Sequence, residues 1–348
     1  MVRAHMKWMA ALLSAELLLW PAHAAAQPGT QKPSSPPAAA PPRARLPTTD
    51  INGQKCVELA AWARTKALHL CWDPKTKAVD LTNRWTHVRG AFGSRHIEIN
   101  GIKTWLSVPI IQKNQALYIS ALDMQALLDP ILLPARTQQG QRVRVVALDP
   151  GHGGKDPGLV VSRRQEKTLT LLWAKKLKTH LEKAGFKVVL TRSRDAYLGF
   201  EERLTVARRA RADVLLSLHY NAAGLSGAGA RGVETYCVTP AGAMSTNAQP
   251  EEPGSTKAVL GNLQNAHNVL LAYQVHKSMV SRLSVEDRGV RRARFALLRS
   301  AGMPAALIEG GFLSTPDEAQ RIASAKHRDE LAKAVAEGVI AYKRLVER

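Results

Sequence analysis

Two histidines and two glutamates in the C-terminal half of the sequence supply the side chains that a hydrolytic metal site needs. They are His152, Glu166, His219 and Glu309. Three such ligands leave a fourth zinc position open for water, and one further carboxylate can take the proton of that water. The four residues therefore indicate metal-assisted hydrolysis, and the elements around them have to bring them together.

Three of the four residues stand where a predicted strand ends. His152 follows the apolar run 143–148 in a glycine-rich loop, His219 ends the run 214–218, and Glu309 ends another such run. Because ligands of open α/β sheets gather at the carboxyl ends of strands, we expect these side chains to lie close together. Burying a charged side chain such as Glu309 costs free energy, so a charge at the end of an apolar strand indicates a function. Burial also raises the pKa of a carboxylate toward a value that suits a general base.

The fourth residue, Glu166, lies in the first turn of a predicted helix, 163–184. The helix dipole favours a carboxylate there whatever its role, so by itself Glu166 is either a ligand or an ordinary helix-start residue. Ser162 and Gln165 predict a capping box for this helix. Asp149, just before the first histidine's loop, is predicted to orient an imidazole.

From residue 141 onward, predicted strands alternate with predicted helices. This order indicates an α/β domain over 141–348, with a twisted, mostly parallel sheet that carries helices on both faces. The predicted strands are 143–148, 187–191, 214–218, 232–238, 295–298 and 305–309. The predicted helices are 163–184, 200–211, 258–283, 316–323 and 327–346.

The first 47 residues contain two segments that we expect to lie outside the folded domains. Residues 1–26 combine Arg3 and Lys7 with a short apolar run and a small-x-small site at 22–24, which predicts a secretory signal peptide. The run is too short for a comfortable bilayer span, so the mature chain is predicted to have no integral membrane span. Residues 27–47 are rich in proline and alanine and predict a semi-extended linker.

The formal net charge of the chain is +21. In an exported protein this charge either aids solubility or attracts an acidic polymer, such as a cell wall rich in carboxylates and phosphates. A nucleic-acid binder needs a basic stripe with interleaved aromatic residues. Aromatic residues make up only 5% of the chain and the basic residues are scattered, so no nucleic-acid partner is predicted.

Residues 48–136 predict a small α+β domain of hairpins and two helices, 57–67 and 121–128. Within it, the stretch Cys71 to Val79 (Cys-Trp-Asp-Pro-Lys-Thr-Lys-Ala-Val) resembles the copper-amine-oxidase-like N-terminal domain, although no histidines here have the spacing of copper ligands. Export permits disulfides, so Cys56 and Cys71 could pair. Cys237 follows an apolar strand pattern and is predicted to be a buried free thiol.

The segments around the four site residues, together with Arg231-Gly232-Val233-Glu234 and Asp287-Arg288-Gly289-Val290, resemble zinc-dependent N-acetylmuramoyl-L-alanine amidases of the AmiC-like group over 143–345. The resemblance implies that His152, Glu166 and His219 bind one Zn²⁺ ion and that Glu309 is the catalytic carboxylate. It also implies peptidoglycan as substrate, and such enzymes can require an activator protein. Gly310 and Tyr220 depart from the family pattern, and each could change the shape of the substrate-binding groove.

Three further features have two readings each. Glu234 is either a second catalytic carboxylate or a salt-bridged strand residue, and Arg288 binds either a stem-peptide carboxylate or a structural partner. The polar loop 239–257 either is solvated or gates the site through Glu251 or Glu252.

These observations predict an exported peptidoglycan amidase with a small N-terminal accessory domain. Two alternatives stay open: a zinc peptidase that cuts elsewhere in wall peptides, and a wall-binding protein that has lost its activity.

Overall fold

The structure is a computed structural model that describes residues 46–137, 142–223, 229–246 and 257–347. The predicted signal peptide, nearly all of the predicted linker, and Glu251 and Glu252 lie outside these residues. Within the described ranges, no helix combines the length and the apolar character that crossing a bilayer requires.

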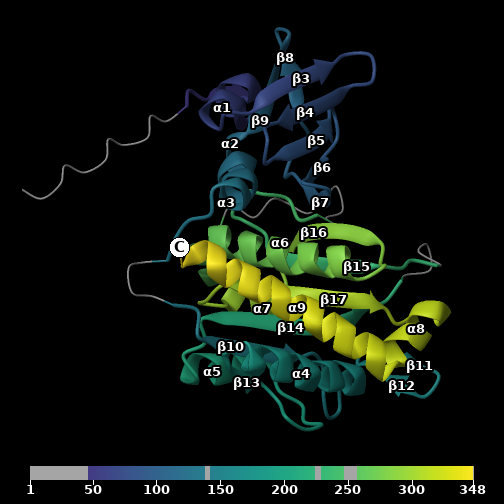
Figure 1. Cartoon of the computed structure of the whole chain (residues 1–348). Helices are drawn as coiled ribbons and strands as arrows, with labels where there is room; N and C mark the ends of the chain where they lie inside the picture. Colours follow the sequence, from purple (N-terminus) through teal and green to yellow (C-terminus); the bar gives the residue numbers. More distant parts are fainter. Residues whose placement is uncertain (1–45, 138–141, 224–228, 247–256, 348) are drawn as a thin grey trace, which may run out of the picture. The chain divides into compact units, whose positions relative to one another are not determined.

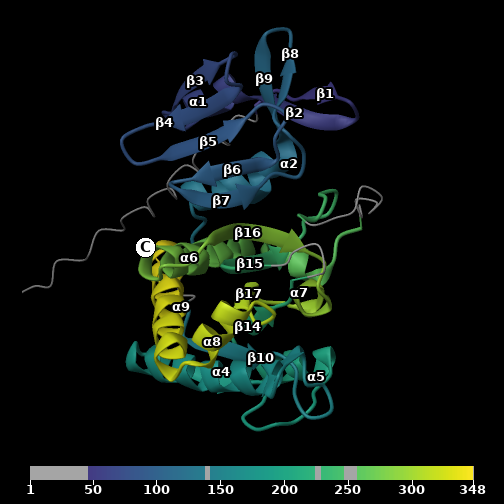
Figure 2. The same cartoon turned by 90° about the vertical axis from the view of Figure 1, so that its right-hand side faces the viewer.

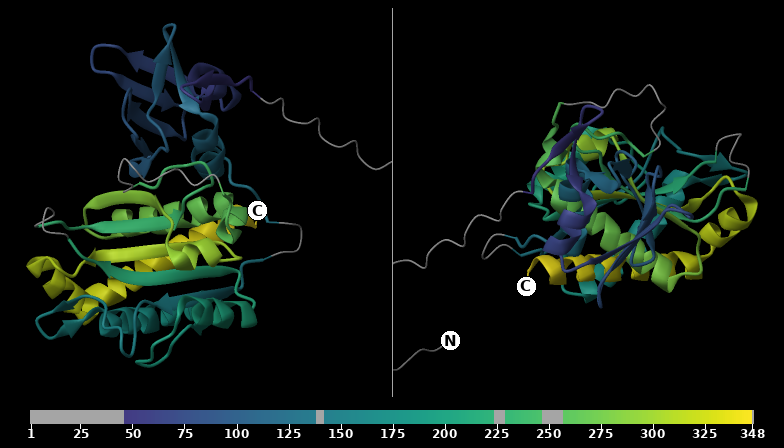
Figure 3. Two further views of the ribbon diagram at one scale, coloured as in Figure 1. Left: turned by 180° about the vertical axis from the view of Figure 1, so that it is seen from behind. Right: turned by 90° about the horizontal axis from the view of Figure 1, so that it is seen from above.

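The main element is an eleven-stranded sheet in which the strands of the C-terminal part lie side by side (Figures 1 and 3). Strands β13, β10, β14 and β17 run parallel to one another, and β15 runs antiparallel to β17 but parallel to β16. In sheet order, the first six strands are β13 (Lys187–Leu190), β10 (Val145–Pro150), β14 (Val214–Asn221), β17 (Ala305–Phe312), β15 (Val233–Val238) and β16 (Asp287–Ala293). The predicted mostly parallel α/β sheet is confirmed.

Alternate residues of the central strands pack into two separate hydrophobic cores, as the two-residue period of a strand requires. Leu148 and Leu216 face one core with helices α4, α6 and α9, whereas Ala147 and Leu215 face the other with α5 and α7. Figure 2 shows α6 and α9 on one side of this sheet and α5 and α7 on the other. The helices are α4 (Glu166–Lys183), α5 (Phe200–Arg209), η3 (Leu260–Gln264), α6 (Asn265–Arg282), α7 (Ala296–Ser300), α8 (Pro316–Ala323) and α9 (Ala325–Val346).

Two details of the predicted element order are wrong. The segment 295–298 was predicted as a strand, but residues 296–298 belong to the short helix α7 and Phe295 is its N-cap residue. The strand before it, β16, was not predicted. The sequence of β16 is Asp-Arg-Gly-Val-Arg-Arg-Ala, which lacks an apolar alternation. It can form an internal strand because its buried Arg292 is paired with Asp123 at 2.9 Å.

The capping box predicted for α4 is also absent. The helix begins at Glu166, its N-cap residue is Gln165, and no side chain caps it. The backbone N–H groups of Glu166 and Lys167 donate instead to the carbonyls of Leu159 and Pro157. These carbonyls lie in the loop before the β11–β12 hairpin (Val160–Val161 and Arg164–Gln165), so that loop fixes where the helix begins.

The N-terminal part consists of hairpins and short helices, as predicted. Five of its strands extend the large sheet, and four form a second, antiparallel sheet in the order β1-β2-β9-β8. The former are β7 (Ile102–Trp105), β6 (His96–Ile99), β5 (His87–Ala91), β4 (Ala78–Thr82) and β3 (His69–Asp73). The remaining elements are β1 (Thr49–Ile51), β2 (Gln54–Glu58), α1 (Leu59–Thr65), β8 (Ile111–Lys113), β9 (Ala116–Ser120), α2 (Ala121–Asp123), η1 (Met124–Leu128) and α3 (Asp129–Leu132).

Strand β7 pairs in parallel with β16, so one sheet runs through both parts of the chain. The Lys103 N–H donates to the Asp287 carboxylate at 2.9 Å, and Asp287 also pairs with His276. Arg292 reaches the N-terminal part as well, where it binds Asp123 and the Ser107 hydroxyl. Residues 46–348 accordingly form one compact unit.

All three cysteines are free. Cys56 is buried in β2 and Cys71 is exposed on β3, so the pairing that we considered for them is wrong. Cys237 is buried, as predicted, and its burial raises the pKa of the thiol to about 11.

Candidate metal centre

His152, Glu166 and His219 converge although they come from a loop, a helix start and a strand end. One Glu166 carboxylate oxygen lies 3.1 Å from His152 Nε2, and the other lies 3.1 Å from His219 Nδ1. One ligand atom from each residue can be chosen so that all lie within 4.8 Å of one another. The fold thus brings together the three residues that the sequence predicted as ligands.

Tight backbone packing lets the three side chains approach. A Cβ atom on Gly151 would lie 2.3 Å from the His219 ring, so only glycine leaves room for that imidazole. The carboxylate of Glu166 also accepts bonds from the N–H groups of Leu159 and Tyr220, at 3.0 and 3.1 Å. Both imidazoles therefore face a carboxylate whose position is set by backbone donors.

The electrostatics of the cluster favour a charged carboxylate. Burial by itself raises the pKa of Glu166, but hydrogen bonds to His152 and His219 outweigh burial and bring that pKa far below its ordinary value. For His152, burial lowers the pKa, but bonds to Glu166 and Asp156 outweigh it and leave the pKa raised. An ionised carboxylate between two imidazoles is a donor set that suits Zn²⁺.

The residue that orients an imidazole is Asp156, which sequence reasoning missed. Its carboxylate lies 2.9 Å from His152 Nδ1, and the Gly158 N–H holds its other oxygen. The Asp-Pro-Gly sequence after Lys155 was the available signal, because aspartate in a turn often bonds the backbone two residues later.

Asp149, for which we predicted this role, contacts other groups. Its buried carboxylate accepts bonds from the hydroxyls of Thr191 and Ser217 and from the Arg203 guanidinium, at 2.6 to 2.8 Å. No imidazole is among its hydrogen-bond partners in the described residues. Asp149 points to the sheet face opposite Leu148, where it meets α5 rather than the histidines.

Glu309 lies directly beside His219, because the two residues are register partners of β14 and β17. Its Oε2 atom is buried and has no hydrogen-bond partner in the described part of the chain. Burial, together with the charges of Glu166 and Glu234, raises the pKa of Glu309 well above the ordinary carboxyl value. A carboxylate that has a raised pKa and a buried oxygen without a partner is typical of a functional group rather than of a structural one.

Glu234 faces Glu309 across the antiparallel pair of β15 and β17. Its buried carboxylate accepts bonds from Asn221 Nδ2, the Tyr236 hydroxyl and Arg288 Nε, at 2.7 to 2.9 Å. The carboxylate of Glu234 thus forms an ion pair with Arg288 and accepts three hydrogen bonds in all. The Arg288 guanidinium also stacks 4.9 Å from the Phe312 ring centroid.

Comparison with known proteins places residues 146–341 in a family described as N-acetylmuramoyl-L-alanine amidase. That match spans more than half of the chain and contains all four site residues. The chain belongs to this amidase family.

Individual relatives agree with the family match. The amidase LytC of Bacillus subtilis is 31% identical over 57% of this chain and 35% of its own length, and the amidase AmiC of Neisseria meningitidis is 33% identical over 60% and 55%. The chain thus spans about half the length of these relatives or less. The solved catalytic domain of the amidase CwlV from Paenibacillus polymyxa is 31% identical, covering 58% of this chain and 99% of that domain, with a TM-score of 0.48.

Within this amidase family, the His-Glu-His cluster is consistent with the zinc site. Gly310 and Tyr220, which we took as departures from the family pattern, both face the core instead of the site. Tyr220 is 2% exposed and packs against Trp173, and a Cβ atom on Gly310 would lie 2.9 Å from Leu331 and 3.0 Å from Trp173. The small Gly310 makes room for the large rings, so both residues contribute to the packing of the core.

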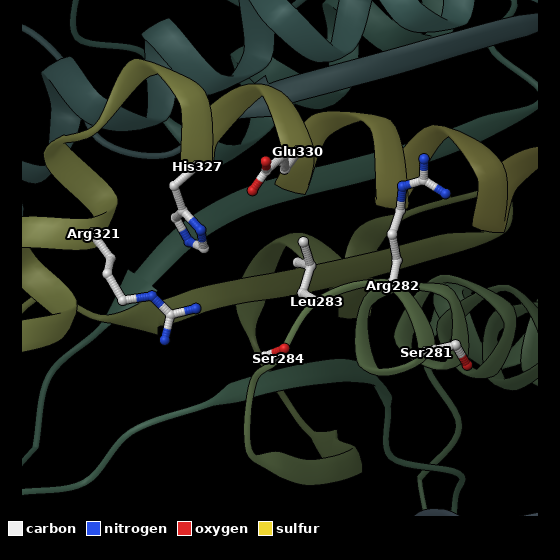
Figure 4. Close-up of a pocket in the computed structure, with 7 residues that line it drawn as sticks. All are labelled: Ser281, Arg282, Leu283, Ser284, Arg321, His327 and Glu330. Carbon is white, nitrogen blue, oxygen red and sulfur yellow. The ribbon is translucent and has the colours of Figure 1, made fainter.

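Figure 4 shows a pocket of about 640 Å³ that is not part of the candidate metal centre. Its lining residues come from the end of α6 and the segment that follows it, from α8 and from α9, and none of the four site residues is among them. They are Ser281, Arg282, Leu283, Ser284, Arg321, His327 and Glu330. Burial and the neighbouring Arg321 lower the pKa of His327, and Arg282 pairs with Glu337 outside the pocket.

Proposed function

We propose that this chain is a zinc-dependent N-acetylmuramoyl-L-alanine amidase that hydrolyses the amide between N-acetylmuramic acid and L-alanine in peptidoglycan. The observation that carries the proposal is the convergence of His152, Glu166 and His219 beside Glu309, whose buried Oε2 has no partner among the described residues. Family membership supplies the substrate class.

The zinc ligands in this proposal are His152, Glu166 and His219. Two imidazoles and one carboxylate are a common ligand set of catalytic zinc sites, which keep a further position for water or substrate. When bound, the ion supplies Lewis acidity, which makes a water molecule more acidic and polarises the amide carbonyl. Asp156 holds the His152 ring in place through Nδ1, and a partner of this kind raises the basicity of a metal-binding imidazole.

Glu309 acts as the general base and then as the general acid. Its position beside His219 puts the carboxylate next to the ligand cluster, where it accepts a proton from water and returns that proton to the leaving L-alanine nitrogen. The raised pKa of Glu309 suits both steps, because a carboxyl group with a pKa closer to neutrality is the stronger base and can also donate.

Digestion of purified peptidoglycan sacculi tests the activity. The proposal expects released peptides that are intact and begin with a free L-alanine amine, together with glycan strands that keep free lactyl carboxylates, as mass spectrometry of both fractions would detect. Truncated peptides would instead indicate a peptidase. Binding without release would indicate an inactive wall protein, and Glu309→Gln serves as the inactive control.

We further propose the following domain arrangement: a signal peptide over 1–26, a linker over 27–47, a copper-amine-oxidase-like accessory domain over 48–136, and the amidase domain over 141–348. The protein would then act outside the cytoplasm, in the periplasm or at the wall, with peptidoglycan and an activator protein as partners. Edman sequencing of the exported protein tests the first boundary, because cleavage after residue 26 leaves Gln27 at the N-terminus.

We propose that the accessory domain contacts the wall through the turn between β4 and β5. Trp85 on this turn is 73% exposed, the Arg84 guanidinium lies 4.2 Å from its ring centroid, and Asn83 Oδ1 accepts bonds from the Trp85 and Thr86 N–H groups. A fixed, exposed aromatic ring with an adjacent cation suits a sugar that bears a carboxylate.

Point substitution tests this contact better than deletion of 48–136, because deletion would expose the edge of β16. Trp85→Ala is expected to reduce pelleting with sacculi and to leave cleavage of a small soluble muropeptide unchanged. Phe295→Ala, which removes another partly exposed aromatic ring, is the control. Equal pelleting of wild type and Trp85→Ala would contradict the proposal.

A further inference from the structure

His152 has a backbone conformation that residues other than glycine rarely adopt. Its φ is +61°, and the two glycines that follow also have positive φ. For a residue with a Cβ atom this left-handed conformation costs about 1–2 kcal/mol relative to the ordinary helical region. Such strain persists only where the surrounding structure holds it, and here it falls on a residue of the proposed metal site.

The buried guanidinium of Arg203 binds the backbone of His152 and of the residues before it. It is 5% exposed and projects from α5, and its Nη2 donates to the His152 carbonyl at 2.9 Å. Its Nη1 donates to the Pro150 carbonyl at 2.9 Å and to Asp149 Oδ1 at 2.8 Å. Two carbonyls on either side of Gly151 are thus fixed by one rigid fork.

A second buried guanidinium, that of Arg192, completes the support. Its Nε donates to the Pro150 carbonyl, and its Nη2 donates to the carbonyls of Gly151 and Lys167, at 2.8 to 2.9 Å. Lys167 directly follows Glu166, so Arg192 connects the histidine loop to the start of α4. Three successive carbonyls, 150 to 152, therefore each accept a bond from a buried arginine.

Asp149 is the only carboxylate that bonds to this arginine pair among the described contacts. Its carboxylate accepts hydrogen bonds from the hydroxyls of Thr191 and Ser217 and forms an ion pair with Arg203. Asp149 therefore fixes the position of the Arg203 guanidinium relative to the sheet. The chain of contacts thus runs from strand β10, through Asp149 and Arg203, to the carbonyl of His152.

We propose that Arg203 is a positioning residue that holds the His152 peptide in its left-handed conformation and thereby sets the metal affinity of the His152–Glu166–His219 site. This inference rests on the proposed function for the identity of the metal. Arginine is required because a lysine ammonium lacks the planar fork that reaches the two carbonyls together. Loss of a supporting contact of this kind typically weakens metal binding by about 10–100-fold.

The test is the zinc affinity of the purified full chain, measured by competition with a chelator, for wild type and Arg203→Lys. We expect the dissociation constant of Arg203→Lys to rise by about 10–100-fold. We also expect turnover to recover most of its wild-type value when zinc is raised well above the new dissociation constant. Arg208→Lys is the matched control, because Arg208 lies on the same helix and makes an exposed ion pair with Glu201.

The thermal midpoint of the metal-free protein separates positioning from general support. A lowered midpoint with an unchanged zinc affinity would overturn the inference. If Arg203→Lys does not fold, Asp149→Asn replaces it in the same measurement. We expect a smaller loss of zinc affinity for that variant, and an unchanged zinc affinity would overturn the inference. Wild type that binds no zinc would refute both this inference and the proposed metal site, whereas zinc binding with cleavage of another bond would refute the proposed activity alone.

Discussion

The substitution Glu309→Gln should separate chemistry from metal binding. Glutamine has nearly the same shape as glutamate but cannot accept the proton of water. The buried Oε2 has no hydrogen-bond partner among the described residues, so the substitution removes no structural bond to that atom. We expect zinc content to stay at one ion per chain and turnover to fall at least about 100-fold, or about 2.7 kcal/mol of activation free energy.

The same variant tests the raised pKa of Glu309 through stability. Burial and the nearby Glu166 and Glu234 raise this pKa in the folded state, so the folded protein binds more protons here than the unfolded chain does. The stabilising contribution is therefore fully present below the unfolded pKa of about 4.3 and is lost as pH rises through the folded pKa. Glutamine has no such dependence, so metal-free wild type should lose stability relative to Glu309→Gln as pH rises.

Two measurements decide between the outcomes. Turnover on sacculi with zinc analysis of the same sample tests the role in catalysis, and urea unfolding of both metal-free proteins between pH 4 and pH 8 tests the pKa. Loss of zinc from Glu309→Gln would make Glu309 a ligand. Near-normal turnover would refute the role of Glu309 as general base, and parallel stability curves for the two proteins would refute its raised pKa.

Three further predictions concern the metal site, the Asp123–Arg292 ion pair and the cysteines. Chelation should abolish hydrolysis and added zinc should restore it, while His219→Ala should fail to retain zinc in elemental analysis; full activity in metal-free wild type would contradict the site. Asp123→Ala should destabilise the protein by about 3–5 kcal/mol in urea unfolding, because it leaves the buried Arg292 unpaired, and a loss below about 1 kcal/mol would mean that the pair contributes little. Under native conditions a thiol reagent should modify the exposed Cys71 quickly and the buried Cys237 only after unfolding, and equal rates for the two would contradict the packing of β15.

Local pattern was enough to predict much of the α/β fold. The apolar runs that became β10, β14 and β17 are continuous because both faces of each strand are buried, and this makes them readable in sequence. The strand β16 escaped prediction because its polarity is tolerated only through partners far away in the chain, such as Asp123 for Arg292. The continuation of the sheet from β16 into β7 had no local signal either, since a strand edge does not specify its partner.

The residues alone were enough to predict the candidate ligands and the candidate base, because His152, His219 and Glu309 each stand at or just after the end of a predicted strand. The residues that support them were not predicted. Asp156, which orients the His152 ring, is only four positions from it and had a local signal that we missed. Arg192 and Arg203, which support the loop of His152, became visible only once residues 41 and 51 positions apart were in contact. The chemical type of a ligand is a local property, whereas the backbone strain and the hydrogen bonds that orient the ligand depend on how distant elements pack against each other.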